Sequence, residues 1–145
     1  MKFSNGCWLN KDGITRFSPQ EVYSSDKNEK VLTMYAPCNR INHRGATLGG
    51  PVITYKISSP LKNVLRIRAY HYMGAQDMGP NFEVKDEEVN IITEETENLI
   101  TVKSGNLSVN IDKDNFGMEF FNKDKYLTKS ANRSSAYLKG TNEKF

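Results

Sequence analysis

Apolar residues recur at every second position along much of this chain, which is the period of a β-strand rather than that of an α-helix. The best example is residues 64–73, where one face carries Leu65, Ile67, Ala69, His71 and Met73. The other face carries Arg66, Arg68, Tyr70 and Tyr72. We therefore predict a strand there, with an apolar face that points into a core and an amphipathic face that points to solvent.

Two more strands are predicted in the first half of the chain. Residues 52–58 are mostly β-branched or aromatic, and they lie between Pro51 and Pro60. Residues 31–36 form a similar apolar run that ends at Pro37. Residues 60–63 have the composition of a turn, and they lead into the strand at 64–73.

The second half of the chain is more regular. Residues 99–103, 107–111, 116–121 and 126–128 are short strand-like segments, and turns rich in Gly, Asn and Asp separate them. This spacing predicts an antiparallel meander, which a further strand at residues 89–93 precedes. The acidic segment 94–98 is predicted to be a turn, and residues 137–140 are predicted to begin another strand.

These patterns predict an all-β fold, an antiparallel β-sandwich with little helix. The 145 residues contain no repeat, low-complexity tract or linker, so we expect residues 1–145 to form one unit that is long enough to bury a core. Apolar residues become sparse after Thr128. We therefore expect the sandwich to be truncated, with further strands missing.

Composition narrows the expected location and partners. Hydrophobic residues make up 37% of the chain and charged residues 26%, a balance that is typical of soluble globular domains. No apolar run approaches the ~18–20 residues that span a bilayer, and residues 1–6 lack the apolar core of a secretion signal. We therefore expect a cytoplasmic protein without membrane contact. The 20 basic and 17 acidic residues are interspersed, so nucleic acid is not an expected partner.

Cysteine and histidine residues are too few and too isolated to predict a metal site. Cys7 and Cys38 are expected to be reduced, partly buried thiols, because two cysteines alone do not make a disulfide framework. His43 and His71 stand apart, and no Cys-x-x-Cys or His-x-x-x-His motif occurs. The glycines of residues 45–50 lack the following Lys-Ser/Thr of a phosphate loop. We therefore predict neither a metal site nor a cofactor site.

Acidic residues are the obvious catalytic candidates, because a glycosidase needs two carboxylates ~5–9.5 Å apart on a rigid scaffold. The acidic groups are Asp86 with Glu87 and Glu88, Glu94 with Glu95, and Asp112 with Asp114. All of them lie in predicted turns, where solvated charge is the ordinary explanation. No Ser-His-Asp order or Gly-x-Ser-x-Gly motif is present. We therefore predict no catalytic residue in this chain.

Two other features are compatible with ligand binding but have simpler interpretations. Residues 73–82 form a long segment rich in Gly and Met, which we interpret as a packed crossover between two sheets. Trp8 has the side chain to stack on a sugar, but we expect it to fix a terminal strand to the core.

Five short segments carry a further signal through their order along the chain. They are Gly-Cys-Trp-Leu at 6–9, an apolar strand at 31–37, a strand ending in Ser-Ser-Pro at 53–60, His-Tyr-Met-Gly-Ala at 71–75 with Gly-Pro at 79–80, and Lys-Ser-Gly-Asn-Leu-Ser at 103–108. In this order they resemble the N-terminal part of bacterial α-xylosidases of glycoside hydrolase family 31. The resemblance extends from residue 5 to about residue 121.

The resemblance implies a galactose-mutarotase-like β-sandwich that precedes a catalytic (β/α)₈ barrel. In that family the nucleophile and the acid/base are both aspartates of the barrel, which is absent from this chain, so no catalytic residue is carried over. The implied role is a non-catalytic scaffold and interaction domain of a glycosidase acting on α-xylosides or α-glucosides. Its implied partner is the catalytic barrel of the parent chain, and the chain alone is expected to be inactive.

Two other functions stay open. A stand-alone carbohydrate-binding module would use exposed aromatic side chains, of which Tyr70 and Tyr72 are the obvious pair. A sugar mutarotase would use His43 or His71 with a glutamate as general acid and base, although no spacing supports this.

We also expect the chain to associate with itself as a symmetric dimer. Unpaired strand edges of an incomplete sandwich recruit other strands, and closed two-fold pairing is the commonest outcome. Lysines on an edge oppose such pairing, and Lys123, Lys125 and Lys129 would do so in part.

Overall fold

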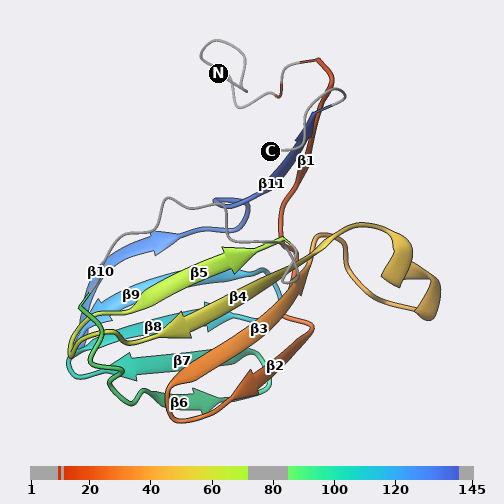
Figure 1. Cartoon of the computed structure of the whole chain (residues 1–145). Coiled ribbons are helices and arrows are strands. Elements are labelled where there is room, and N and C mark those ends of the chain that lie inside the picture. Colours follow the sequence, from red (N-terminus) through yellow and green to blue (C-terminus); the bar gives the residue numbers. More distant parts are fainter. Residues whose placement is uncertain (1–9, 11, 72–84, 141–145) are drawn as a thin grey trace.

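The structure, a computed structural model, describes residues 10, 12–71 and 85–140. In this part of the chain, strands form two antiparallel sheets that lie face to face, and a two-stranded ribbon projects from one end (Figure 1). The one helical segment among the described residues is η1, a 3₁₀ helix at Arg44–Leu48. The predicted antiparallel β-sandwich with little helix is confirmed.

The first sheet has four strands in the order β2-β3-β4-β5. Their bounds are Ser24–Lys27, Val31–Pro37, Val52–Ser58 and Arg66–Tyr70. The strands predicted at 31–36 and 52–58 are confirmed, and the strand predicted at 64–73 is confirmed over its middle part. Tyr72 and Met73 lie outside the described residues.

The second sheet has five strands in the order β10-β9-β8-β7-β6. Their bounds are Lys125–Ser130, Gly117–Asn122, Leu107–Asp112, Leu99–Ser104 and Ile92–Glu95. Each strand pairs with its neighbour in the sequence, so the predicted meander is confirmed.

The prediction for the first strand of the meander was wrong in its limits. β6 begins at Ile92 and continues through Glu94 and Glu95, whereas the sequence predicts a turn at these two residues. The two carboxylates are compatible with a strand because each is paired with a lysine, Lys103 at 2.9 Å and Lys113 at 2.9 Å. Acidic composition alone therefore does not mark a turn here.

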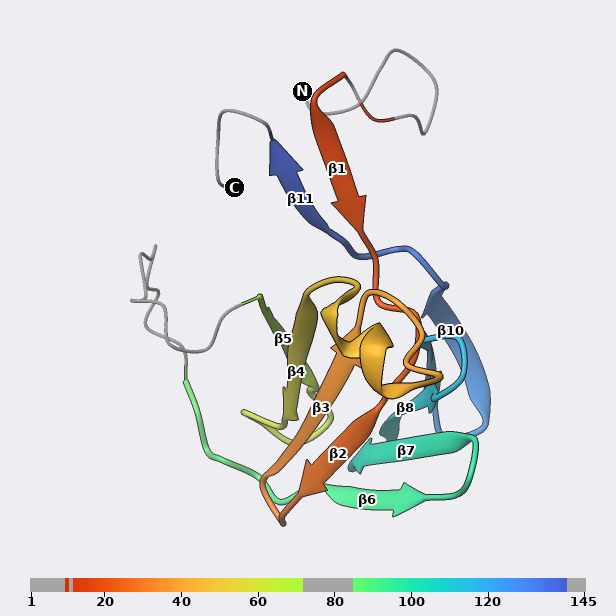
Figure 2. The same cartoon turned by 90° about the vertical axis from the view of Figure 1, so that its right-hand side faces the viewer.

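The ribbon consists of β1 (Ile14–Phe17) and β11 (Tyr137–Gly140), which pair with each other and extend away from the sandwich (Figure 2). β11 is the strand predicted at 137–140. β1 and β2 were not predicted. β2 has the sequence Ser-Ser-Asp-Lys, and an edge strand held by backbone hydrogen bonds to β3 does not need the apolar alternation that identifies a strand in a sequence.

The core lies between the two sheets and follows the predicted alternation. Its most deeply buried side chains are Leu32, Met34, Ile57, Ile100, Val102, Val109 and Ile111. Ala69 and His71 lie on the predicted face of β5, the face that carries the core residue Tyr55 on β4, but both are exposed. Only their burial was wrongly predicted, because β5 is an edge strand, and the His71 ring stacks on Tyr137 at 3.9 Å.

The two sheets are also joined by polar contacts. Near the edge strands β2 and β6, the carbonyl oxygen of Glu29 accepts the backbone N–H of Ile91 at 2.7 Å, and Ser25 donates to Glu95 at 3.3 Å. Elsewhere the buried hydroxyls of Ser59 and Ser104 lie 2.6 Å apart and bridge the sheets. These contacts fix one sheet against the other, so the outer face of the first sheet is a well-supported surface.

Candidate functional site

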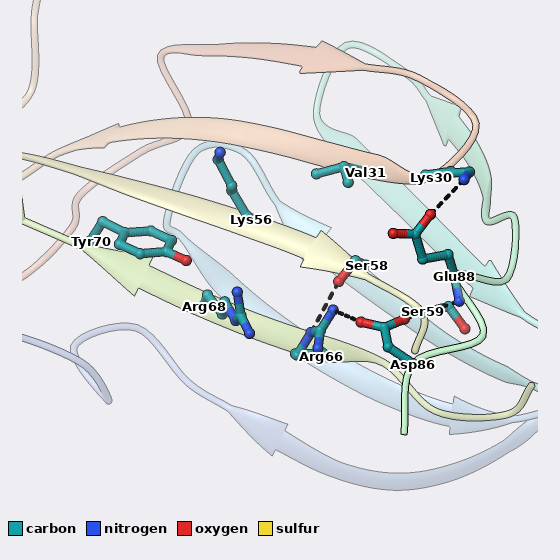
Figure 3. Close-up of a pocket in the computed structure, with 10 residues that line it drawn as sticks. All are labelled: Lys30, Val31, Lys56, Ser58, Ser59, Arg66, Arg68, Tyr70, Asp86 and Glu88. Atoms are coloured by element: carbon teal, nitrogen blue, oxygen red, sulfur yellow. Dashed lines mark hydrogen bonds and ion pairs between the residues drawn. The ribbon is translucent and has the colours of Figure 1, made fainter. Parts of the chain in front are cut away.

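The outer face of the first sheet is polar because every second residue of β3, β4 and β5 points away from the core. Strand register places these residues in rows that cross the sheet. One row is Thr33, Lys56 and Arg68, and the next is Val31, Ser58 and Arg66. Tyr70 follows Arg68 on the same face of β5. The surface therefore combines cationic, hydroxyl and aromatic side chains (Figure 3).

The segment that leads to β6 crosses one end of this face and turns it into a hollow. Val89 forms an isolated β-bridge with Ser59, and the backbone N–H of Glu87 donates to the carbonyl oxygen of Pro60 at 2.7 Å. The hollow has a volume of about 220 Å³. We call it the outer-face hollow, and it is lined by Lys30, Val31, Lys56, Ser58, Ser59, Arg66, Arg68, Tyr70, Asp86 and Glu88 (Figure 3).

Two ion pairs hold the edge of the hollow in place. The Arg66 guanidinium contacts the Asp86 carboxylate at 2.5 Å, and the Lys30 ammonium contacts the Glu88 carboxylate at 2.6 Å. The hydrogen bond from Arg66 lowers the pKa of Asp86 below its ordinary value, and the hydrogen bond to Glu88 raises the pKa of Lys30. Asp86 and Lys30 are therefore charged at neutral pH.

The hollow as a whole carries excess positive charge. Its lining contains four cationic side chains and two carboxylates, which leaves a net charge of +2. The excess comes from Lys56 and Arg68, which lie directly opposite each other on β4 and β5. Neither forms an ion pair with any residue that the structure describes. Such a site can bind an anion, because an anion would offset the repulsion between two like charges that lie opposite each other on neighbouring strands.

The same geometry is unsuited to acid–base catalysis. A glycosidase general acid needs a raised pKa so that it keeps a proton at neutral pH. Asp86 has a lowered pKa, and Glu88 is paired with Lys30. Neither carboxyl group has the environment that this chemistry requires.

The other acidic groups singled out from the sequence have structural partners. Glu94 pairs with Lys103, and the hydrogen bond from Lys113 is the main cause of a lowered pKa at Glu95. The Asp112 carboxylate accepts the backbone N–H groups of Asp114 and Asn115 at 2.8 and 3.1 Å, so it stabilises the turn after β8. The structure does not bring these acids into the outer-face hollow.

The two histidines are also separate from the hollow. His43 is exposed and precedes η1, where its side chain makes no capping hydrogen bond. His71 lies just after β5 and stacks on Tyr137, with the ring planes only 4° apart. No group of three or more His, Cys, Asp or Glu side chains in the described part of the chain is arranged to hold a metal ion.

Several residues of interest can be placed only in part. Cys38 is half-buried, and burial raises the pKa of its thiol to about 11. Cys7, Trp8, Tyr72 and the segment 73–82 lie outside the described residues. Among the helical residues that the structure describes, none belongs to a helix long and apolar enough to cross a bilayer.

The sequence predicts only part of the hollow. The alternation at residues 64–73 places Arg66, Arg68 and Tyr70 on an outer face. Lys56 and Ser58 were not predicted, although their alternation with the buried Tyr55 and Ile57 indicates that they lie on the outer face of β4. The contributions of Lys30 and Glu88 depend on contacts between distant segments, and no local pattern marks them.

The chain is similar in sequence to α-xylosidases, although no family model matches it. It is 31% identical over 139 residues to the α-xylosidase XylQ of Lactiplantibacillus pentosus, and 30% identical over 115 residues to an α-xylosidase of Emericella nidulans. These matches cover 95% and 77% of this chain but only 18% and 14% of the two relatives. The chain spans less than a fifth of their length, and it is homologous to the N-terminal region of α-xylosidases.

Solved structures agree on the fold. The cycloalternan-forming enzyme of Listeria monocytogenes, solved with a pentasaccharide substrate, matches with a TM-score of 0.63 at 18% identity. An uncharacterised protein from the same organism gives the same values. Each match covers 89% of this chain and 11% of the other. At this identity the likeness establishes the β-sandwich fold, which makes up only part of each matched chain.

Proposed function

We propose that this chain is the N-terminal, non-catalytic β-sandwich of a glycoside hydrolase family 31 enzyme that acts on α-xylosides or α-glucosides. The observation that carries the proposal is the alignment with XylQ, which includes 95% of this chain but only 18% of that enzyme. The sandwich serves as a scaffold and interaction domain, and its partner is the catalytic barrel of the parent enzyme.

The geometry of the described acids supports a non-catalytic role. Asp86, Glu94 and Glu95 are bound to basic side chains, and the pKa values of Asp86 and Glu95 are lowered rather than raised. Asp112 is occupied by backbone N–H groups. These are the environments of structural carboxylates.

A carbohydrate-binding module is the second candidate, and one observation favours it. Tyr70 lines the outer-face hollow beside polar side chains, which is a suitable surface for a sugar. A mutarotase has less support, because no described hydrogen bond joins His43 or His71 to a glutamate.

The proposal is tested by assaying the purified chain with p-nitrophenyl α-D-xylopyranoside and the matching glucoside, with XylQ as the positive control. We expect no turnover above buffer. Turnover that copurifies with the chain and is lost in Asp86→Asn or Glu88→Gln would overturn the proposal. Glu97→Gln is the matched control, because Glu97 is exposed and forms no ion pair with a described residue.

A further inference from the structure

The lining of the outer-face hollow contains two cations, Lys56 and Arg68, that form no ion pair with a described residue. Lys56 and Arg68 are direct cross-strand neighbours, and the two carboxylates at the edge are already engaged with Lys30 and Arg66. In the close-up view, Lys56 and Arg68 extend from neighbouring strands on the same face of the sheet as Tyr70 (Figure 3). The arrangement therefore has a charged part and an aromatic part side by side.

We propose that this hollow binds a monosaccharide that carries one negatively charged group, either a carboxylate or a phosphate. The anionic group lies between Lys56 and Arg68, and the sugar ring lies against Tyr70.

The charged part of the site accounts for the anion. Lys56 and Arg68 are cross-strand neighbours of like charge, and an anion bound by both would offset their repulsion and accept a charge-assisted hydrogen bond from each. The guanidinium of Arg68 also suits an oxyanion, because its planar set of donors matches two oxygens of one carboxylate or phosphate group.

The remaining lining accounts for a sugar rather than a bare anion. Tyr70 is half-buried and lines the hollow, so its ring can offer an aromatic surface to the apolar face of a pyranose ring. The Ser58 hydroxyl and the carboxylates of Asp86 and Glu88 can accept hydrogen bonds from sugar hydroxyls.

The size of the hollow suits a single sugar unit. Its volume is about 220 Å³. That is room for a monosaccharide and not for an extended oligosaccharide within the hollow. The Arg66–Asp86 and Lys30–Glu88 ion pairs keep the edge in position before the ligand arrives, which reduces the entropic cost of binding.

The choice of a sugar rests on the proposed function, whereas the choice of an anion rests on the charges of the hollow. The two can fail separately. A failure to bind the charged sugar would not change the result expected in the glycosidase assays. Turnover by the chain alone would not change the result expected in the binding experiments.

The test is isothermal titration calorimetry of the 145-residue chain with D-glucuronate, D-glucose 6-phosphate, inorganic phosphate and D-glucose. We expect glucuronate or glucose 6-phosphate to bind about tenfold more tightly than both glucose and inorganic phosphate, and to weaken as salt is added. The two charged sugars show which anion the hollow takes. Equal binding of glucose, or equal binding of inorganic phosphate, would overturn the proposal.

Substitutions locate the site. The double variant Lys56→Gln/Arg68→Gln should weaken binding of the charged sugar by about tenfold or more. Tyr70→Leu should also weaken binding of the charged sugar, and it should not make glucose the preferred ligand. Lys125→Gln/Lys129→Gln is the matched control, because it removes the same charge from β10 in the other sheet. Circular dichroism confirms that each variant keeps the β-fold. Unchanged affinity in the first double variant, or equal loss in the control, would place the ligand elsewhere and overturn the proposal.

Discussion

The turn between β7 and β8 gives a sharp test of how the two sheets are held together. Gly105 follows Ser104 and has a φ of 58°, which suits the first central position of a type II′ turn. Asn63 lies between β4 and β5 of the other sheet, and its Oδ1 accepts the backbone N–H of Asn106 at 2.7 Å. A Cβ on Gly105 would overlap this oxygen.

We therefore expect Gly105→Ala to lower the free energy of unfolding by about 2–3 kcal/mol. The left-handed backbone conformation accounts for about 1–2 kcal/mol of this in any residue with a Cβ. Displacement of the Asn63 oxygen from Asn106 accounts for about 1 kcal/mol more. Gly117→Ala is the matched control, because its Cβ would meet only the Ser130 carbonyl oxygen at 3.9 Å, and we expect it to change stability by less than about 1 kcal/mol.

The assay is urea denaturation followed by circular dichroism, with a double-mutant cycle through Asn63→Gly. Asn63 itself has a φ of 64°, so glycine keeps the backbone conformation while it removes both the overlap and the hydrogen bond. In that background, Gly105→Ala should cost only about 1–2 kcal/mol. A cost that matches Gly117→Ala, or one that Asn63→Gly leaves unchanged, would refute the reasoning.

Three other outcomes follow from the structure. Because Lys113 lowers the pKa of Glu95, the Glu95 carboxylate stabilises the fold above its ordinary pKa of 4.5 and loses this effect as the pH falls. Glu95→Gln should therefore lower the urea midpoint at neutral pH. A difference in midpoint between this variant and the wild type that persists at pH well below 4.5 would contradict this. Tyr55→Phe should cost about 1 kcal/mol in the same denaturation assay, because the buried phenol lies 2.6 Å from the Ser135 hydroxyl; no loss would show that this contact is not stabilising. Leu127 is 47% exposed on the edge strand β10, so light scattering across a dilution series should show self-association that Leu127→Lys reduces, and a clean monomer at high concentration would contradict it.

The sequence predicted the fold well where strands bury one face. β3, β4, β7 and β8 have an apolar inner face, and their limits were predicted to within one residue. β2 has no apolar side chain, and it exists because β3 offers it a backbone edge. Such strands are specified by their neighbours, so no pattern within them reveals them.

The candidate site was harder to predict because it depends on register. The alternation at residues 64–73 placed Arg66, Arg68 and Tyr70 on an outer face, but only the pairing of β4 with β5 sets Lys56 opposite Arg68. The return of Asp86 and Glu88 over the sheet joins segments that are 20 or more residues apart. The burial of His71 was predicted from strand period alone, and that period does not show where a sheet stops being covered.

The central claim is that this chain does in its parent enzyme what the N-terminal region of XylQ does in that α-xylosidase. It is tested most directly by a chimera in which this chain replaces the aligned segment of XylQ, which includes 139 residues of this sequence. We predict that the chimera is soluble and hydrolyses p-nitrophenyl α-D-xylopyranoside, whereas XylQ without the segment does not. A soluble chimera without activity, or full activity of XylQ after deletion of the segment, would contradict the account.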